Sequence, residues 1–347
     1  MPYDTVVAKT IEYLAVPSVV GHEKHFIKFL KNDFEKLGVT VIEHEGVLEV
    51  HGRTPNAQII SAHIDRHGLI SHGNGEFGYA AEYMKECKYN EEKTPTQKML
   101  EAIGDRFNGE EVFAYDSQTG DKIGEGVISD AGPHLIHDDC IFKVHGLPPD
   151  LPKNIPVAYA RTAVSDGNIL KGQIDNVVSL GVIYTLFQNG YQGTALLTCE
   201  EEIGRSWVHI TNWLDKKKIE TTDLIIIDTS PYRETAPIES GTVVLRNRDK
   251  NAKFDKNLTA KIKQRCTDKL TPFQFKDEYL GQLGVETSGL GSTELGRIVQ
   301  KSQGRWSGAS VQIPTTEYHT SYETTSRESI ENYYFILQNI LVNEPVI

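Results

Sequence analysis

Several short apolar runs in this chain are followed at once by a histidine or an acidic residue, and this pattern constrains the fold most. Residues 57–62 lead into His63, residues 195–198 precede three consecutive glutamates, and residues 224–227 lead into Asp228. An open α/β sheet presents ligand-binding side chains beyond the carboxyl ends of its strands. We therefore expect these polar side chains to lie close together at one edge of a sheet.

Segments with helical periodicity separate the apolar runs. Strands that alternate with helices predict a largely parallel sheet with helices on both faces. The expected fold class is therefore α/β, a three-layer sandwich around a mostly parallel mixed sheet. Apolar spacing predicts helices near residues 6–14, 22–37, 175–188, 254–270 and 294–301, and a last helix that opens at a capping box from Thr325 to Glu328.

The middle of the chain, from about Ser71 to Ala163, breaks this rhythm and is polar and rich in turns. A helix is predicted at residues 97–107, and strands at 112–115 and 123–128 flank a hairpin turn. We interpret residues 71–163 as an inserted β-rich domain. Residues 1–70 and 164–347 would then form the catalytic domain.

Composition excludes several classes of partner. A chain of 347 residues is long for one hydrophobic core, and its net charge of −12 argues against nucleic acid and anionic membranes. The first residues lack the features of a secretory signal, and no apolar run approaches the length of a membrane span. Four scattered cysteines without CxxC spacing suit a reducing compartment. A cytoplasmic protein is expected.

Clustered acidic residues and histidines predict metal binding. The adjacent carboxylates Glu200, Glu201 and Glu202 must either repel one another or share a cation. Histidine and carboxylate side chains are the ligands that a pair of divalent ions such as Zn²⁺ requires. Two ions about 3.5–4 Å apart can activate a water and polarise a carbonyl group, and a carboxylate that is not a ligand can move the proton.

Four short motifs and two single aspartates resemble those of the co-catalytic dizinc aminopeptidases, a family that includes the tetrahedral, glutamyl and deblocking aminopeptidases and has a zinc-exopeptidase-like fold. The motifs are residues 62–68, similar to AHxDxxG, residues 201–204, similar to EEVG, residues 291–294, similar to GGTDA, and residues 313–323, similar to IPT…HS…E. Asp175 and Asp228 stand at the places of two further ligands.

The resemblance implies a role for each site residue. His63, Asp175, Glu202, Asp228 and His319 would be the metal ligands, with Asp175 bridging the two ions. Glu201 would be the general base and Asp65 would orient His63. The implied cofactors are two divalent ions per subunit, zinc in the first place, with cobalt or manganese as options.

The resemblance also implies peptide substrates, removal of N-terminal residues, and a homo-oligomer. That oligomer would be built from dimers, up to a twelve-subunit particle, with residues 71–163 making contacts between subunits. The insertion lies in the 175 − 65 = 110 positions between the first motif and the bridging Asp. In dizinc deacylases and carboxypeptidases with a lid, the insertion comes after the bridging Asp and the glutamate pair. These enzymes therefore match less well, and they are kept as an alternative. A non-catalytic relative with a binding role is another.

Some positions depart from the family pattern. Asn176 and Val177 replace the usual residues after the bridging Asp, whereas Arg66 and residues 205–207 differ at positions that we expect near the cleft. His67 lies four residues after His63, a spacing that pairs metal ligands on a helix. Because the preceding residues predict a strand, a packing role is expected for His67.

Overall fold

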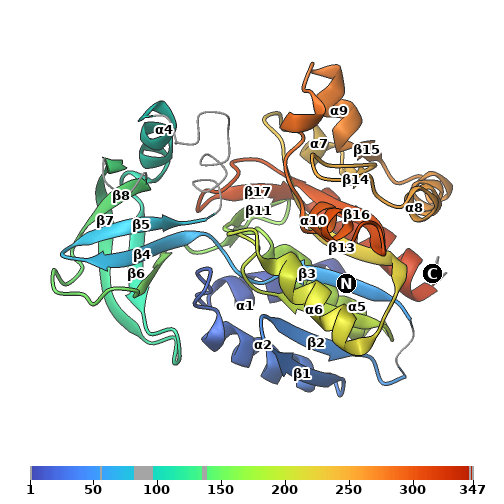
Figure 1. Cartoon of the computed structure of the whole chain (residues 1–347), viewed down its shortest axis with the longest axis horizontal. Helices are drawn as coiled ribbons and strands as arrows, with labels where there is room; N and C mark the ends of the chain where they lie inside the picture. The colour runs from blue at the N-terminus through green and yellow to red at the C-terminus, as the bar shows by residue number, and fades with distance from the viewer. Residues whose placement is uncertain (1, 55–56, 82–96, 135–138, 344, 346–347) are drawn as a thin grey trace.

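An eight-stranded mixed sheet is the largest element of the computed structural model (Figure 1). The structure describes residues 2–54, 57–81, 97–134, 139–343 and 345. The four central strands run parallel to one another, and the antiparallel pairs lie towards the two edges. In spatial order the strands are β1 (Thr40–His44), β2 (Val47–His51), β12 (Thr194–Thr198), β3 (Ile59–His63), β13 (Thr221–Pro231), β16 (Trp306–Thr315), β14 (Val243–Arg246) and β15 (Phe273–Phe275).

Helices cover both faces of this sheet. Neighbouring strand residues point to opposite faces, so Ile60 and Ile59 of β3 belong to different hydrophobic clusters. The cluster with Ile60 takes in α1 (Pro2–Leu14), α2 (Lys24–Glu35), α5 (Val177–Gln188), α8 (Lys256–Asp268) and α11 (Arg327–Gln338). The cluster with Ile59 takes in α6 (Ser206–Lys217) and α10 (Glu294–Lys301). The expected α/β class with a large mixed sheet and helices on both faces is confirmed.

A closed six-stranded barrel follows β3 in the chain and lies to one side of the sheet (Figure 1). It has its own hydrophobic core, in which Phe77 and Phe142 pack against Phe107 of α4 (Gln97–Phe107). The predicted hairpin is present, because β6 (Glu111–Tyr115) and β7 (Lys122–His134) pair antiparallel. In barrel order the strands are β4 (Gly68–Gly73), β5 (Glu76–Ala80), β8 (Asp139–His145), β7 (Lys122–His134), β6 (Glu111–Tyr115) and β9 (Pro156–Tyr159).

The remaining elements are short. A three-stranded antiparallel sheet is formed by β10 (Val164–Ser165), β11 (Ile169–Gly172) and β17 (Glu323–Ser326). Two short α-helices are α7 (Ala236–Glu239) and α9 (Lys276–Gln282), with a 3₁₀ turn at Thr287–Gly289 and a π turn at Asn339–Asn343. These pieces connect the main layers, and two of them, β17 and α9, carry residues of the sites described below.

Two local expectations are wrong, and one helix was not expected. The cap of α11 is Ser326, whose side chain accepts a hydrogen bond from the Ser329 N–H, whereas Thr325 belongs to β17 and donates to Pro314 O. The strand that carries Asp228 does not end there but continues to Pro231, because β16 extends its pairing. Helix α6 was not predicted at all.

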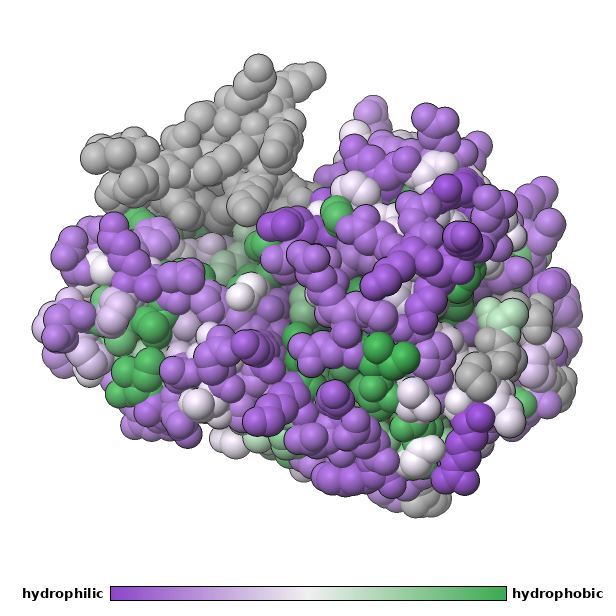
Figure 2. Space-filling view, turned by 60° about the horizontal axis from the view of Figure 1, so that its bottom comes forward, coloured by the Kyte–Doolittle hydropathy of each residue, from purple (hydrophilic) through white to green (hydrophobic). Residues whose placement is uncertain are grey.

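The surface agrees with the composition. Figure 2 shows a face that is mostly hydrophilic, with hydrophobic side chains in small groups between polar ones. No helix among the described residues is both long and apolar enough to cross a membrane.

Candidate metal centre

Five potential ligands reach one place from different elements. His63 ends β3, and Asp228 lies on the neighbouring strand β13, just past the last residue of β13 that pairs with β3. Glu202 follows β12, and Asp175 precedes α5. His319 lies in the loop between β16 and β17. All are buried except Asp228, which is partly exposed.

These side chains form two groups that share Asp175. His63, Asp175 and Asp228 make one group, and Asp175, Glu202 and His319 make the other, with ligand atoms within 4.8 Å of one another in each group. The His63 Nε2 atom lies 3.2 Å from Asp175 Oδ1 and 3.4 Å from Asp228 Oδ1. The His319 Nε2 atom lies 3.2 Å from Glu202 Oε2. One carboxylate thus stands between two histidines.

Buried polar atoms in these groups lack hydrogen-bond partners. Asp175 Oδ1, Glu202 Oε1 and His319 Nδ1 have none among the described residues. A buried carboxylate oxygen without a partner is costly, and a bound cation removes that cost. The donor set of two imidazoles and three carboxylates suits borderline divalent ions such as Zn²⁺. The residues present therefore fit a pair of divalent ions.

Glu323 fixes the two segments that bring in Asp175 and His319. Its carboxylate accepts hydrogen bonds from the backbone N–H of Asp175 at 2.9 Å and of His319 at 2.8 Å. Burial raises the pKa of Glu323 well above its usual range, the Asp175 charge adds to that rise, and these donors oppose it. The neighbouring Asn176 donates to Ile227 O on β13. Both residues hold Asp175 in place, and the sequence motif had included Glu323 without giving it a role.

Asp65 holds the glutamate turn more closely than it holds His63. Its two carboxylate oxygens accept hydrogen bonds from the backbone N–H groups of Glu201 and Glu202, at 3.0 and 2.9 Å. The His63 Nδ1 atom lies 3.1 Å from the Asp65 backbone oxygen but 3.7 Å from its carboxylate, which is too long for a hydrogen bond. The orienting contact to His63 therefore comes from the backbone of Asp65.

Glu201 faces the cleft and is not a member of either ligand group. Burial raises the pKa of its carboxyl well above the usual range. The positive charge of His63 opposes that rise, and the nearby Asp228 and Glu202 add to it. The side chain thus has the position of a proton-transfer group beside the two ligand groups.

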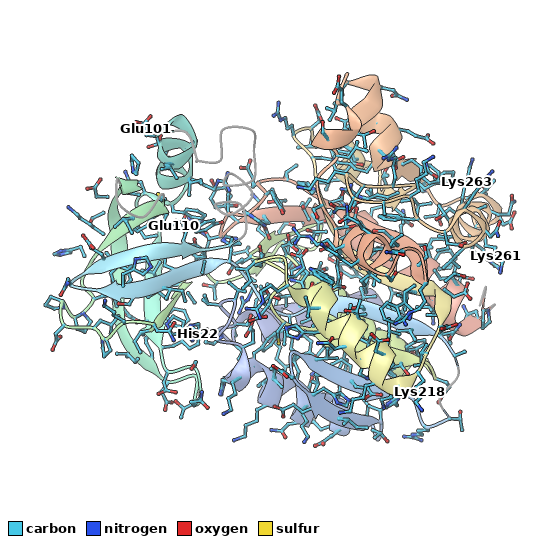
Figure 3. The ribbon with its side chains drawn as sticks, in the orientation of Figure 1. His22, Glu101, Glu110, Lys218, Lys261 and Lys263 are labelled. Atoms are coloured by element: carbon cyan, nitrogen blue, oxygen red, sulfur yellow. The ribbon has the colours of Figure 1, made fainter. Side chains whose placement is uncertain are left out.

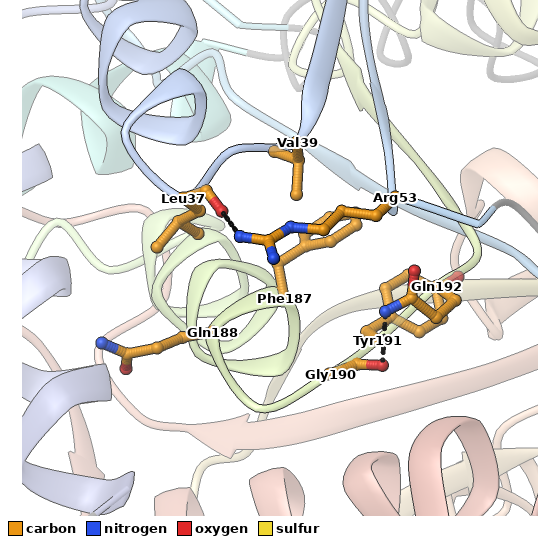
Figure 4. Close-up of a pocket in the computed structure, with 8 residues that line it drawn as sticks. All are labelled: Leu37, Val39, Arg53, Phe187, Gln188, Gly190, Tyr191 and Gln192. Carbon is orange, nitrogen blue, oxygen red and sulfur yellow. Dashed lines mark hydrogen bonds between the residues drawn. The ribbon is translucent and has the colours of Figure 1, made fainter.

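The two groups open into a cleft of about 1130 Å³. A second cavity of about 250 Å³ lies elsewhere, lined by Leu37, Val39, Arg53, Phe187, Gln188, Gly190, Tyr191 and Gln192 (Figure 4). In that cavity Arg53 donates to Leu37 O, and no lining residue is acidic or a histidine. Of the two cavities described, only the larger cleft is lined by potential metal ligands.

The barrel contacts the loop that carries His319. Ser321, two residues further on, donates to Glu110, which lies on the barrel side in Figure 3. Glu110 also pairs with Arg161 at 2.9 Å. The position of His319 therefore depends on both the sheet and the barrel.

Three residues expected near the cleft do not line it. Arg66 is buried against the end of α1, where it donates to the backbone oxygens of Leu14 and Val16. Arg205 is exposed, and the Trp207 indole donates to Gly204 O. We expected these positions to lie near the cleft, and none of the three residues is among those that line it.

His67 has a packing environment. Its ring lies among the rings of Tyr79, Phe107, Tyr159 and His319, with centroids 5.0–6.0 Å away. It belongs to neither ligand group. Burial lowers the pKa of His67 well below its usual range, and His319 adds to this effect.

Comparison with solved structures defines the fold, although no protein-family model and no curated protein matches the sequence. A TET aminopeptidase from a marine sediment archaeon of the Thaumarchaeota superposes with a TM-score of 0.73 at 14% identity, over 99% of this chain and 97% of that chain. An aminopeptidase from the archaeon Desulfurococcus kamchatkensis gives 0.72 at 14% identity, over 98% and 95%. The TET1 peptidase of Pyrococcus horikoshii gives 0.68 at 16% identity, over 97% and 99%.

The chain has the fold of the TET aminopeptidases. The match spans nearly the whole of each chain, so it includes the barrel as well as the large sheet. The resemblance drawn from the sequence motifs is thus confirmed at the level of the TET fold. At such low identity the likeness concerns fold alone, and function must be argued from the site.

Proposed function

We propose that this protein is a two-metal aminopeptidase that removes N-terminal residues from peptides. The observation that carries the proposal is the placement of Asp175 between two groups of potential ligands, each with its own histidine. A shared carboxylate is what holds two divalent ions close enough to act on one peptide bond. The TET fold supports the same class of reaction.

Each ligand has a proposed role. His63 and Asp228 would hold one ion, Glu202 and His319 would hold the other, and Asp175 would be shared by both. We favour zinc, because two histidines with carboxylates are typical zinc ligands, while cobalt and manganese accept similar donors. The unpartnered oxygens of Asp175 and Glu202 support this assignment.

The protein's own groups would manage the proton. When bound, the two ions would make a water more acidic and polarise the scissile carbonyl group. Glu201 would take the proton from the attacking water and deliver it to the leaving amine. Asp65 holds the turn that carries Glu201 and Glu202 through two backbone hydrogen bonds, so it acts by positioning.

We also propose different roles for two parts of the chain. Residues 1–70 and 164–347 would form the catalytic domain, and residues 71–163 would make contacts between subunits. The Pyrococcus horikoshii relative is described as assembling into a tetrahedron or a large octahedral shell, and another TET1 structure as a dodecamer. These assemblies support a homo-oligomer here. The buried thiols of Cys199 and Cys266, which are not in disulfides, support a reducing, cytoplasmic location.

The test combines metal content with three kinds of substrate: peptides with a free N-terminus, N-acylated amino acids, and peptides blocked at the N-terminus but free at the C-terminus. The proposal predicts turnover of the first kind only, in protein that contains two ions per subunit. Turnover of the second or third kind alone would instead favour a deacylase or carboxypeptidase. Loaded protein that turned over none of them would favour a binding role.

A further inference from the structure

Two buried cations line the cleft that contains the candidate metal centre. Arg246 is the last residue of β14, and Lys276 is the first residue of α9. Their residues are 6% and 4% exposed. Buried arginine and lysine side chains are rare unless they are paired with an anion.

Neither cation has such a partner in the described part of the chain. Arg246 Nε donates to Gln312 Oε1 at 2.8 Å, and Arg246 Nη1 donates to Leu290 O at 3.0 Å. The Lys276 ammonium donates to Pro231 O and lies 3.3 Å from the centre of the Tyr232 ring. These contacts are to neutral groups, so the charge of both side chains is not compensated by any carboxylate within 4 Å.

The cationic pair lies close to the metal ligands. Gln312, which holds the guanidinium of Arg246, is the residue of β16 that lies opposite Asp228 on β13. Adjacent strands are about 4.8 Å apart. Since β14 lies beyond β16, Arg246 is two strands from Asp228, or about 10 Å across the sheet by the strand spacing, and both residues line the same cleft.

We infer that Arg246 and Lys276 form a subsite that binds a carboxylate of the substrate. A planar guanidinium and a nearby ammonium match the two oxygens of a carboxylate, and burial strengthens the interaction. The inference rests on the proposed function in one respect. If the scissile carbonyl lies at the metal centre of an aminopeptidase, the group that reaches this subsite is the side chain of an N-terminal Asp or Glu.

The charges around Lys276 support an anion-binding role. Burial lowers the pKa of Lys276 to about 7, Arg246 contributes to that lowering, and Glu234 opposes it. Glu234 itself accepts a hydrogen bond from Tyr279, whose ring centre lies 5.4 Å from the Lys276 ammonium, and Arg233 and Tyr232 also line this part of the cleft. A bound carboxylate would raise the pKa of Lys276, so binding near pH 8 takes up a proton.

The first experiment compares kcat/KM for peptides that begin with Glu and with the neutral isostere Gln. The wild-type protein should prefer Glu, because only Glu supplies the missing negative charge. Lys276→Met and Arg246→Gln should each lower the Glu-to-Gln ratio by about 30-fold or more, as for loss of one partner of a buried charge pair. Lys256→Met is the matched control, since Lys256 is the exposed first residue of α8 and should leave the ratio unchanged.

The second experiment is independent of turnover. Calorimetry at pH 8 in two buffers of different ionisation enthalpy measures binding of glutarate, with neutral glutaramide for comparison. Wild-type protein should bind glutarate with proton uptake, and Lys276→Met should bind it much more weakly without that uptake. Equal binding by both proteins, or equal binding of glutarate and glutaramide, would overturn the subsite.

The two proposals fail in different ways. Cleavage of peptides regardless of an N-terminal acid, with no glutarate binding, would overturn the subsite and leave the aminopeptidase standing. If glutarate binding depended on Lys276 but no peptide with a free N-terminus were cleaved, the subsite proposal would stand and the aminopeptidase proposal would be wrong. If the variants affected only peptides with a free C-terminal carboxylate, and not their amides, the bound group would be that carboxylate and the assignment to an N-terminal side chain would be wrong.

Discussion

At the scale of single residues, Asp175 depends on contacts that no local sequence pattern contains. Its carboxylate lies between histidines that are 256 positions apart (319 − 63), and its backbone N–H is fixed by Glu323. The sequence named each candidate ligand through its resemblance to the family. It did not show that the Asp65 carboxylate holds the turn with Glu201 and Glu202, because that contact joins residues 136 and 137 positions apart.

Replacing Glu201 by Gln should abolish turnover while both ions remain bound. A general base moves a proton without holding the ion, so its loss lowers kcat by about 10²–10⁴-fold. Kinetics and metal analysis of the same preparation measure both effects. Glu200→Gln is the matched control, since Glu200 pairs with His209 and Arg205 outside the ligand groups. A Glu201→Gln protein with near wild-type kcat would show that the base lies elsewhere.

At the scale of elements, prediction succeeded where local signals agree. The helices at Gln97–Phe107 and Glu294–Lys301 have the predicted bounds, and Thr293 caps the second by accepting from Gly296 N–H. Helix α6 was missed because Val208, Ile210 and Thr211 favour strands and Arg205 makes no capping hydrogen bond. The sequence placed the last cap one residue early because it could not show that tertiary pairing holds Thr325 in β17.

The observed cap of α11 leads to a stability prediction. Ser326→Ala should destabilise the protein by about 1 kcal/mol, because the side chain satisfies the Ser329 N–H at the helix start. Glu328→Gln should have almost no effect, since Glu328 is exposed and is not part of a capping box here. Urea unfolding of both variants measures the difference. If Glu328→Gln were the more destabilising of the two changes, the result would instead support the capping box predicted from Thr325 to Glu328.

Glu49 links the edge of the sheet to α6. Its carboxylate lies 2.9 Å from the Lys217 ammonium and also contacts His44 and His51. Burial would raise the pKa of Glu49, but contacts with Trp213, Lys217 and His44 lower it to about 2. A carboxyl whose pKa is lower in the folded state stabilises that state above the unfolded pKa, near 4.3, and loses this contribution as the pH falls towards 2.

Glu49→Gln should therefore weaken the dependence of stability on pH in this window. Between pH 6 and pH 3 the free energy of unfolding should fall less in the variant than in wild type, by on the order of 2 kcal/mol. Glu45→Gln, at an exposed position of the same hairpin, is the control and should behave as wild type. Parallel curves for Glu49→Gln and wild type would mean that the Glu49 contacts do not stabilise the fold.

At the scale of the whole molecule, the large sheet and the barrel share contacts. The Tyr115 hydroxyl of the barrel accepts from the Val19 N–H, and both residues belong to a small hydrophobic cluster with Ala80 and Ala158. Alternating strands and helices were enough to predict the α/β class. Closure of the barrel was not predictable, because it depends on pairing between β4 and β9, nearly 90 positions apart.

The proposed assembly predicts a particle mass well above that of one 38.8 kDa chain. Light scattering of the purified protein should give a multiple of that mass, and removal of the inserted segment should reduce it. A stable and fully active monomer would contradict the assembly. An unchanged particle size after the deletion would place the contacts on the large sheet or its helices.

The most direct test of the central claim is the number of metal ions bound per subunit in wild type and in three ligand variants. The shared position of Asp175 predicts two ions in wild type, loss of both in Asp175→Asn, and about one ion each in His63→Ala and His319→Ala. Asp223→Asn, on β13 but outside the site, should keep both. A single ion in fully loaded, active wild-type protein, or two ions retained by Asp175→Asn, would contradict a two-metal centre bridged by Asp175.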